Sequence, residues 1–322
     1  MSETLHRNKI ILLGTIQALI LMISGIAWVS TQPKATFPDP AQDSFVAAPA
    51  TPTFLPETPT PSPTNTITPI EVTEVPLLPV ISSTPTDIPL QAGPLIIGYS
   101  IAGRPLEIYR FGKGTIERLI VAGIHGGSEW NTVDLALELI TYLQDHPQTV
   151  PDNITLYILP NINPDGYARA HGTEGRTNEN GVDLNRNWPY LWQSTWDTSG
   201  CWSLLPVSAG AYPTSEPETL ALLRFILHHE IDALISYHSA ALGIFAGGVP
   251  DYTPSMRLAE AVAAVATYQY PPYDTGCSFT GNLTDWAAAQ GIASLDIELS
   301  NHVDLDLEQN LKILHVFLNW NR

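Results

Sequence analysis

The chain has 322 residues, which is enough for one large catalytic domain or two small ones. Its 14 Lys and Arg against 32 Asp and Glu give a formal net charge of −18, which argues against a nucleic-acid binder because such proteins need cationic patches. Two cysteines are too few for a disulfide scaffold or a cysteine-built metal site, although they could form one bridge. Three segments of different composition follow one another.

The first segment, 1–31, contains an apolar run without charges from residue 10 to residue 29. A helix of about twenty residues spans roughly 30 Å, the thickness of the hydrocarbon core of a bilayer. Arg7 and Lys9 precede the run and only Lys34 follows it closely, so the positive-inside rule predicts a cytoplasmic N-terminus. We expect a single-pass anchor in the cell membrane with the rest of the chain outside; a cleaved signal peptide and a secreted protein are the alternative.

The second segment, 32–92, is a predicted disordered linker. Residues 31–90 hold 14 prolines and 12 threonines and lack glycine, tryptophan and cysteine. Proline removes amide donors and fixes φ, so this stretch cannot hold a helix or a central strand. The composition indicates an extended linker, either a stalk that holds the next domain off the membrane or a disordered segment without a spacing role.

The third segment, 93–322, has the composition of a globular domain. Apolar β-rich runs alternate with helical patterns, which predicts an α/β fold with a mixed, mainly parallel central sheet flanked by helices. Strands are expected at 106–110, 119–123, 155–159, 233–238 and 294–299, and helices at 132–145 and at the C-terminal end. A further helix is expected to start at Ser215, whose spacing to Glu218 predicts a capping box.

His125 and His238 each follow a predicted strand, where α/β enzymes place their active sites. Glu129 lies four residues after His125. Two imidazoles and one carboxylate can form a zinc site with an open fourth position for water. A histidine at a strand end is usually an ordinary surface or capping residue, but the motifs that accompany these two favour the metal site.

The accompanying motifs are NPDG at 163–166, DLNRNW at 183–188, YHS at 237–239 and IEL at 297–299. In this combination and order they resemble the zinc metallocarboxypeptidase family related to pancreatic carboxypeptidase A (peptidase family M14). The resemblance covers nearly all of residues 93–322. It implies the phosphorylase/hydrolase-like carboxypeptidase fold and a catalytic domain that hydrolyses the C-terminal peptide bond of peptides with a free C-terminal carboxylate.

The resemblance also implies catalytic roles. His125, Glu129 and His238 match the ligands of one Zn²⁺ per catalytic domain, which would acidify a water and polarise a carbonyl. Arg176 matches the arginine that stabilises the oxyanion. Glu298 matches the general base that deprotonates the attacking water and later protonates the leaving amine.

Substrate binding is implied for three more residues. Asn185 and Arg186 match the pair that holds the terminal carboxylate of the substrate. Thr284 matches a position that helps to set side-chain selectivity, and since threonine cannot neutralise a buried cation, a neutral C-terminal residue is expected. Asp183 and Asp285 are expected to orient neighbouring groups rather than to react.

Three features depart from the family pattern, one of them a domain shorter than that of the digestive enzymes, from which we expect trimmed loops around the cleft. Three residues separate His125 from Glu129, where the vertebrate enzymes have two, and we expect Gly126 and Gly127 to absorb the extra residue as a bulge. The family's substrate-capping tyrosine falls on Cys277, counted back from Asp285 and Trp286.

Both cysteines are expected to lie in the exported domain, and we expect a disulfide between Cys201 and Cys277. Tyr273 could take the place of the capping tyrosine, although nothing in the sequence shows that it does.

Two other readings stay open. A cell-wall peptide amidase or an acyl-amino-acid deacylase would use a related fold, and a wall peptide also has a free terminal carboxylate. A non-catalytic binding module on a stalk would be favoured by loss of Glu298 or of a metal ligand, and the sequence retains all of them.

Overall fold

The computed structural model describes residues 93–198 and 207–322. The expected membrane segment at 10–29, the linker 32–92 and Cys201 lie outside the described residues. Within the described ranges, none of the helices is both long and apolar enough to cross a membrane.

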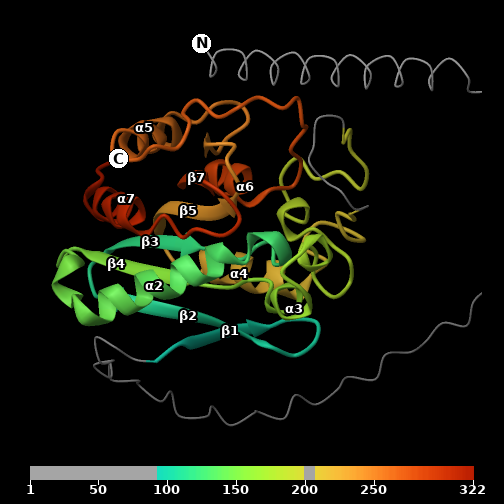
Figure 1. Ribbon diagram of the computed structural model, residues 1–322, viewed down its shortest axis with the longest axis horizontal. Coiled ribbons are helices and arrows are strands. Elements are labelled where there is room, and N and C mark those ends of the chain that lie inside the picture. Colours follow the sequence, from blue (N-terminus) through green and yellow to red (C-terminus); the bar gives the residue numbers. More distant parts are fainter. Residues whose placement is uncertain (1–92, 199–206) are drawn as a thin grey trace, which may run out of the picture. The chain divides into compact units, whose positions relative to one another are not determined.

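The described residues form a seven-stranded mixed sheet in the order β1-β2-β4-β3-β5-β7-β6 (Figure 1). The four neighbours β4, β3, β5 and β7 are parallel, whereas β1, β2 and β6 are antiparallel to their neighbours. This confirms the predicted fold class, with parallel strands at the centre of the sheet. The strands are β1 (Leu95–Tyr99), β2 (Pro105–Gly112), β3 (Ile116–Val121), β4 (Ile154–Leu159), β5 (Ile231–Ser239), β6 (Ile244–Ala246) and β7 (Ala293–Leu299).

Helices cover both faces of the sheet, because each buried strand presents apolar residues to both sides. In β3, Ile120 belongs to the apolar cluster that contains side chains of α2, α5 and α7, whereas Leu119 belongs to the cluster that contains side chains of α4 and α6. Each such side chain contributes about 1.5–3 kcal/mol when fully buried. The helices are α2 (Asn131–Asp145), α3 (Pro164–Arg169), α4 (Pro217–Leu227), α5 (Thr253–Ala263), α6 (Leu283–Ala289) and α7 (Leu307–Asn319).

All five predicted strands are present, with ends that shift by at most three residues. The prediction carried β3 two residues too far, because the chain leaves the strand before Gly123, whose φ is +63°. Two strands were not predicted. β1 lies at the sheet edge with exposed apolar side chains, and β6 has only three residues, so neither carries a clear pattern.

The predicted capping box at the start of α4 is wrong. The helix begins at Pro217, whose fixed φ suits the first helical position, and Ser215 donates instead to the Glu216 carboxylate at 2.6 Å. Glu218 is fully buried and accepts from the Ile101 amide at 3.0 Å and from Asn178 at 3.2 Å. The carboxylate is therefore used to connect α4 to the turn after β1 rather than to cap its own helix.

Strand β7 separates the core from the site. Leu295 and Ile297 belong to the apolar cluster with α5 and α7, whereas Asp296 and Glu298 lie on the other face and line a cavity. Since β5 and β7 are parallel and in register, His238 lies directly beside Glu298.

Candidate active site

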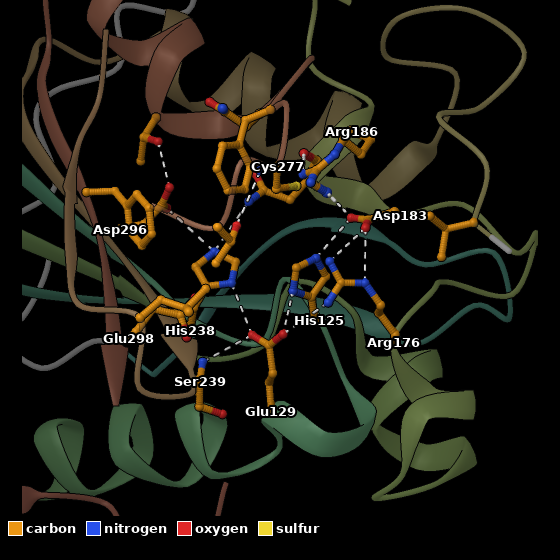
Figure 2. A pocket seen from close by; sticks show the side chains of 18 of the residues that line it. His125, Glu129, Arg176, Asp183, Arg186, His238, Ser239, Cys277, Asp296 and Glu298 are labelled. Atoms are coloured by element: carbon orange, nitrogen blue, oxygen red, sulfur yellow. Dashed lines mark hydrogen bonds and ion pairs between the residues drawn. The ribbon is translucent and has the colours of Figure 1, made fainter. Parts of the chain in front are cut away.

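A cavity of about 700 Å³ lies at the carboxyl ends of the central strands (Figure 2). His125 follows β3, His238 is the second-last residue of β5, and Glu298 is the second-last residue of β7. Glu129 ends the short 3₁₀ turn Gly127–Glu129. The parallel sheet thereby collects residues from distant parts of the chain at one edge, as expected for an α/β enzyme.

Three side chains converge on a place where a metal ion can bind. The ligand atoms of His125, Glu129 and His238 all lie within 4.8 Å of one another, and the three residues are buried. Glu129 Oε1 lies 2.8 Å from Nδ1 of His125, and Oε2 lies 3.0 Å from Nδ1 of His238. Burial opposes the charge on Glu129, but its contacts with the two histidines outweigh this and hold the pKa of the carboxyl well below its usual range. Two imidazoles and an ionised carboxylate fit the donor set of a zinc site.

The extra residue between His125 and Glu129 is accommodated by the 3₁₀ turn and not by the expected bulge. Gly127 has a φ of +66°, and a Cβ there would lie 2.2 Å from the carbonyl oxygen of Gly172. A Cβ on Gly126 would lie 2.3 Å from the amide nitrogen of Tyr167. Both positions therefore require glycine for the turn to pack closely enough to bring the Glu129 carboxylate to the histidines.

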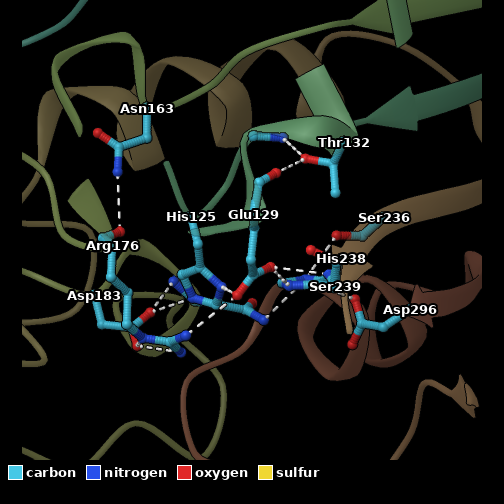
Figure 3. A network of polar contacts seen from close by, with 12 residues as sticks. His125, Glu129, Thr132, Asn163, Arg176, Asp183, Ser236, His238, Ser239 and Asp296 are labelled. Atoms are coloured by element: carbon cyan, nitrogen blue, oxygen red, sulfur yellow. Dashed lines mark hydrogen bonds and ion pairs between the residues drawn. The ribbon is translucent and has the colours of Figure 1, made fainter. Parts of the chain in front are cut away.

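Asp183 contacts the ring nitrogen of His125 that faces away from Glu129 (Figure 3). Its Oδ1 lies 2.9 Å from Nε2 of His125, and its Oδ2 accepts from Arg176 Nη2 at 2.9 Å. Burial opposes the charge on Asp183, but Arg176 and His125 together hold the pKa of the carboxyl well below its usual range. An ionised acceptor at Nε2 fixes the imidazole proton there and leaves Nδ1 available as a metal ligand. The structure thus agrees with the orienting role expected for Asp183.

Arg176 lies between this carboxylate and the metal ligands. Two of its nitrogens are held by Asp183, and Nη1 lies 3.3 Å from Glu129 Oε1. Its guanidinium lines the cavity and is about a quarter exposed. It is a fixed positive charge on the side of the cavity where the metal ligands lie.

Asn185 and Arg186 form a second polar group in the same cavity. Asn185 Oδ1 accepts from the Leu283 amide at 3.0 Å, which orients its Nδ2 toward His238 Nε2 at 3.4 Å. The Arg186 guanidinium lies 5.6 Å from the ring of Trp196 and 5.3 Å from the ring of Phe279. Among the described residues, Arg186 Nε has no hydrogen-bond partner. Burial lowers the pKa of Arg186 from its usual value, with Asp183 opposing that shift. The side chain is a cation with an unused donor.

Glu298 adds a carboxyl group to the wall of the cavity. Its Oε2 is buried and has no hydrogen-bond partner within the described part of the chain. Burial, together with the nearby Glu129 charge, raises the pKa of Glu298 to about 8, although His238 and Arg176 act in the opposite direction. A carboxyl whose pKa lies near neutrality can both accept and return a proton.

Thr284 lines the cavity as predicted, but its hydroxyl is not free, because it donates to Asp296 Oδ2 at 2.8 Å. Asp296 itself was not singled out from the sequence. The signal was present, since strand alternation places it on the same face as Glu298, two residues along. Of the two residues considered for the capping position, Cys277 lines the cavity, whereas Tyr273 is 58% exposed and is not among the described residues that line it.

The fold and the site together define an α/β metallohydrolase whose cavity combines three metal ligands, a buried carboxyl and two arginines. Comparison with known proteins identifies its family: residues 81–311 match the model of the zinc carboxypeptidase family. The chain therefore belongs to this family of zinc-dependent peptide hydrolases.

Curated relatives agree with this assignment. The chain is 27% identical to carboxypeptidase B of Astacus astacus over 243 residues, which cover 66% of this chain and 79% of the relative. It is 29% identical to carboxypeptidase A1 of Rattus norvegicus over 229 residues, covering 61% of this chain and 54% of the relative. The chain thus spans about half the length of the mammalian carboxypeptidases that it matches.

Solved structures agree in fold. A murein-tripeptide amidase from Escherichia coli O157 superimposes with a TM-score of 0.53 at 24% identity, covering 72% of this chain and 93% of that one. Bovine thrombin-activatable fibrinolysis inhibitor superimposes with a TM-score of 0.57 at 22% identity, covering 71% and 89%. These similarities support the fold alone.

Proposed function

We propose that the protein is a zinc exopeptidase that removes the C-terminal residue of peptides with a free carboxylate. The observation that carries this proposal is the shared cavity, in which a three-ligand metal site, a buried carboxyl of raised pKa and a cationic group with an unused donor line the same space. His125, Glu129 and His238 would hold the zinc. When bound, the metal would supply a Lewis acid for the scissile carbonyl and a means of lowering the pKa of water.

Arg186 and Asn185 would bind the terminal carboxylate of the substrate. The guanidinium offers planar donors that match a carboxylate, and the two aromatic rings beside it restrict where it can move. Binding at this place would fix the register of the substrate, because it accepts only a chain end. This favours an exopeptidase over an endopeptidase.

Glu298 would take the proton of the attacking water and deliver it to the leaving amine. Its oxygen Oε2 is unpaired, so no hydrogen bond within the described protein must break before the proton moves. Arg176 would stabilise the negative charge that develops on the carbonyl oxygen, since its orientation is already fixed by Asp183. Preorganised charge of this kind costs no reorientation during the reaction.

The proposal is tested with purified protein and dipeptides blocked at the amino end. Release of the free C-terminal amino acid, lost on chelation and restored by zinc, is the expected result. A matched substrate with an amidated C-terminus should be cleaved far more slowly, because it lacks the carboxylate that Arg186 would bind. Equal rates on both substrates would refute the exopeptidase assignment. Preferential release from wall tripeptides over ordinary peptides would favour the cell-wall amidase instead.

We further propose that the enzyme is exported, held at the cell membrane by the segment at 10–29 and stabilised by a disulfide between Cys201 and Cys277. The uncharged run that follows Arg7 and Lys9 supports the membrane anchor. The disulfide is supported by the two cysteines of the chain, since disulfides persist in exported proteins. Co-fractionation of activity with membranes, with release by external protease, tests the anchor. Thiol labelling under non-reducing conditions tests the disulfide, and two reactive cysteines would refute it.

A further inference from the structure

His302 is a residue of the cavity wall that the mechanism proposed above does not use. It lies three residues after the end of β7 and lines the cavity, although it is exposed to solvent. Its Nδ1 lies 3.0 Å from the hydroxyl of Ser239, which is buried. One nitrogen of the imidazole is therefore held by the protein, and Nε2 is the polar atom of the ring that remains for a bound molecule.

The hydrogen bonds around Ser239 determine which nitrogen of His302 carries the proton. Asn131 is fully buried, and its Nδ2 donates to the carbonyl oxygens of Asn301 at 2.8 Å and Asp304 at 2.9 Å. Both protons of the amide are then used, and its oxygen Oδ1 faces the Ser239 hydroxyl at 3.0 Å. An amide oxygen can only accept, so the single proton of the hydroxyl is directed to Asn131.

The Ser239 hydroxyl can therefore only accept from His302. Nδ1 of His302 must carry a proton to make this contact, and in the neutral imidazole Nε2 is then unprotonated and an acceptor. The other tautomer would leave Nδ1 and the hydroxyl oxygen facing each other with no proton between them. The buried amide of Asn131 thus determines, through Ser239, the hydrogen-bonding character of a ring that lines the cavity.

The loop that carries His302 is fixed by hydrogen bonds within the protein. Asn301 Oδ1 accepts from the amides of Val303 at 2.8 Å and Asp304 at 2.7 Å. The two carbonyl groups bound by Asn131 attach the same loop to the first residue of α2. A side chain on a fixed loop loses little conformational entropy when it binds a ligand, so a hydrogen bond made there contributes to affinity.

The contacts of His238 show on which side of the metal site His302 lies. Glu129 Oε2 accepts from the Ser239 amide at 3.2 Å and lies 3.0 Å from Nδ1 of His238 (Figure 2). Asn185, which would hold the substrate carboxylate, approaches the other nitrogen of His238, Nε2, at 3.4 Å. A peptide with its carboxylate at Asn185 and its scissile carbonyl at the metal ligands continues away from Asn185, toward Ser239 and His302.

We infer that His302 binds the part of the peptide that precedes the scissile bond, with Nε2 accepting a hydrogen bond from the first backbone N–H upstream of that bond. This inference rests on the proposed function. The first upstream N–H is the donor expected there, because Ser239 directly follows the ligand His238 and contacts the ligand Glu129. A backbone N–H is present whatever the side chains are, so the contact would favour an acylated residue at this place without selecting a sequence.

The test compares two blocked substrates that share the scissile bond and the free C-terminal carboxylate. In the first, an amide N–H joins the blocking acyl group to the residue before the scissile bond; in the second, an ester oxygen replaces that N–H. The wild-type enzyme should show a kcat/KM about 2–12-fold higher for the amide, the range of a hydrogen bond between neutral groups. His302→Phe keeps a ring without an acceptor and should abolish this preference. His315→Phe changes an exposed histidine of α7 that is not among the described residues of the cavity wall, and this matched control should preserve it.

The position of the proton is measured separately. Two-bond correlation spectra between imidazole protons and ¹⁵N nuclei should show His302 as a neutral ring protonated at Nδ1, with the signal assigned by its loss in His302→Phe. This readout does not depend on activity. A ring protonated at Nε2 alone, or at both nitrogens at the pH of the assay, would overturn the inference.

The other outcomes also have defined meanings. Equal kcat/KM for the amide and the ester in the wild-type enzyme would overturn the inference. If His302→Phe lowered both values by the same factor, His302 would be a positioning residue that acts through Ser239, and the inference would be wrong. A wild-type enzyme that hydrolysed neither substrate would instead refute the proposed function, and the inference with it.

Discussion

Glu298→Gln is the substitution that tests the proposed mechanism most directly. Glutamine keeps the size of the side chain and its place on β7, but it cannot accept the proton of water. A general base contributes about 10²–10⁴-fold to the rate, which corresponds to about 3–5 kcal/mol of barrier. Asp296 lies on the same strand face but is held by Thr284 and lies beside His238, so it should not replace the lost base. We expect kcat to fall by at least about 10²-fold, in the range given for a general base.

The assay is hydrolysis of a blocked dipeptide with a free C-terminus, accompanied by zinc analysis and thermal unfolding. Zinc content should remain at one per chain, since the three ligands are unchanged. The comparison variant is Asp152→Asn, an exposed change that should keep the wild-type rate. A Glu298→Gln enzyme that retained zinc and turned over at near the wild-type rate would show that another group takes the proton, and the mechanism proposed above would be wrong.

The same substitution has a consequence for stability in the metal-free protein. The pKa of Glu298 rises from its usual 4.5 to about 8 on folding, so between these values the native state holds a proton that the unfolded state releases. Stability from this group is therefore complete below pH 4.5 and decreases as the pH rises through 8. Relative to the wild type, Glu298→Gln should gain up to about 5 kcal/mol over this window. A constant difference between the two proteins across the window would contradict the burial argument.

Three further substitutions test the surroundings of the site. His125→Ala should lose the metal itself, measured as a zinc stoichiometry well below one, and full zinc occupancy would exclude this histidine as a ligand. Asp183→Asn should weaken zinc binding by about 10–100-fold in competition with a chelator, because the amide no longer fixes the proton on His125; an unchanged affinity would contradict this role. Asp165→Asn should cost about 1–3 kcal/mol at pH 7, because hydrogen bonds from Ala102, Ser100 and Arg104 overcome the burial of the carboxyl and lower its pKa. Because the folded pKa of Asp165 is lowered, its ionised carboxylate stabilises the fold above the usual pKa of 3.8, and this stabilisation is lost as the pH falls through the folded pKa. The stability difference between Asp165→Asn and the wild type should therefore shrink in acid. A difference that did not depend on pH would contradict a stabilising role for the ionised carboxylate.

The centre of the sheet could be predicted because strands that are buried on both faces appear in the sequence as continuous runs of apolar residues. Strand 155–159 was placed within one residue of β4 for this reason. Strand 294–299 was placed within one residue of β7 although Asp296 and Glu298 alternate with its apolar residues. Edge elements carry no such signal, which is why β1 and β6 were not predicted. The start of α4 was predicted incorrectly because Ser215 and Glu218 have the spacing of a cap, while the side chains that compete for them come from elsewhere in the fold.

The grouping of His125, Glu129, His238 and Glu298 at one cavity could be predicted because these residues belong to short motifs with fixed positions relative to strand ends. Their supporting contacts could not, because these depend on distances between segments that are far apart in the chain. Asp183 lies 58 positions from His125, yet their side chains are 2.9 Å apart. The turn at Gly127 is a local feature, but its form depends on the carbonyl of Gly172, which only the folded chain brings near.

Asp296 shows what a reading of single positions leaves out. A threonine at 284 indicates a neutral pocket as long as its neighbours are unknown. The register of β5 and β7 places Asp296 beside Ser236 and Glu298 beside His238, so an acid two residues before the base lies on the cavity face of the same strand. The hydrogen bond from Thr284 then orients that acid without neutralising it. Strand β7 therefore presents two carboxyl groups, Glu298 and Asp296, to one cavity. Because both are fixed by the same pairing of β5 with β7, a substitution at 296 that preserves this pairing should leave Glu298 in place.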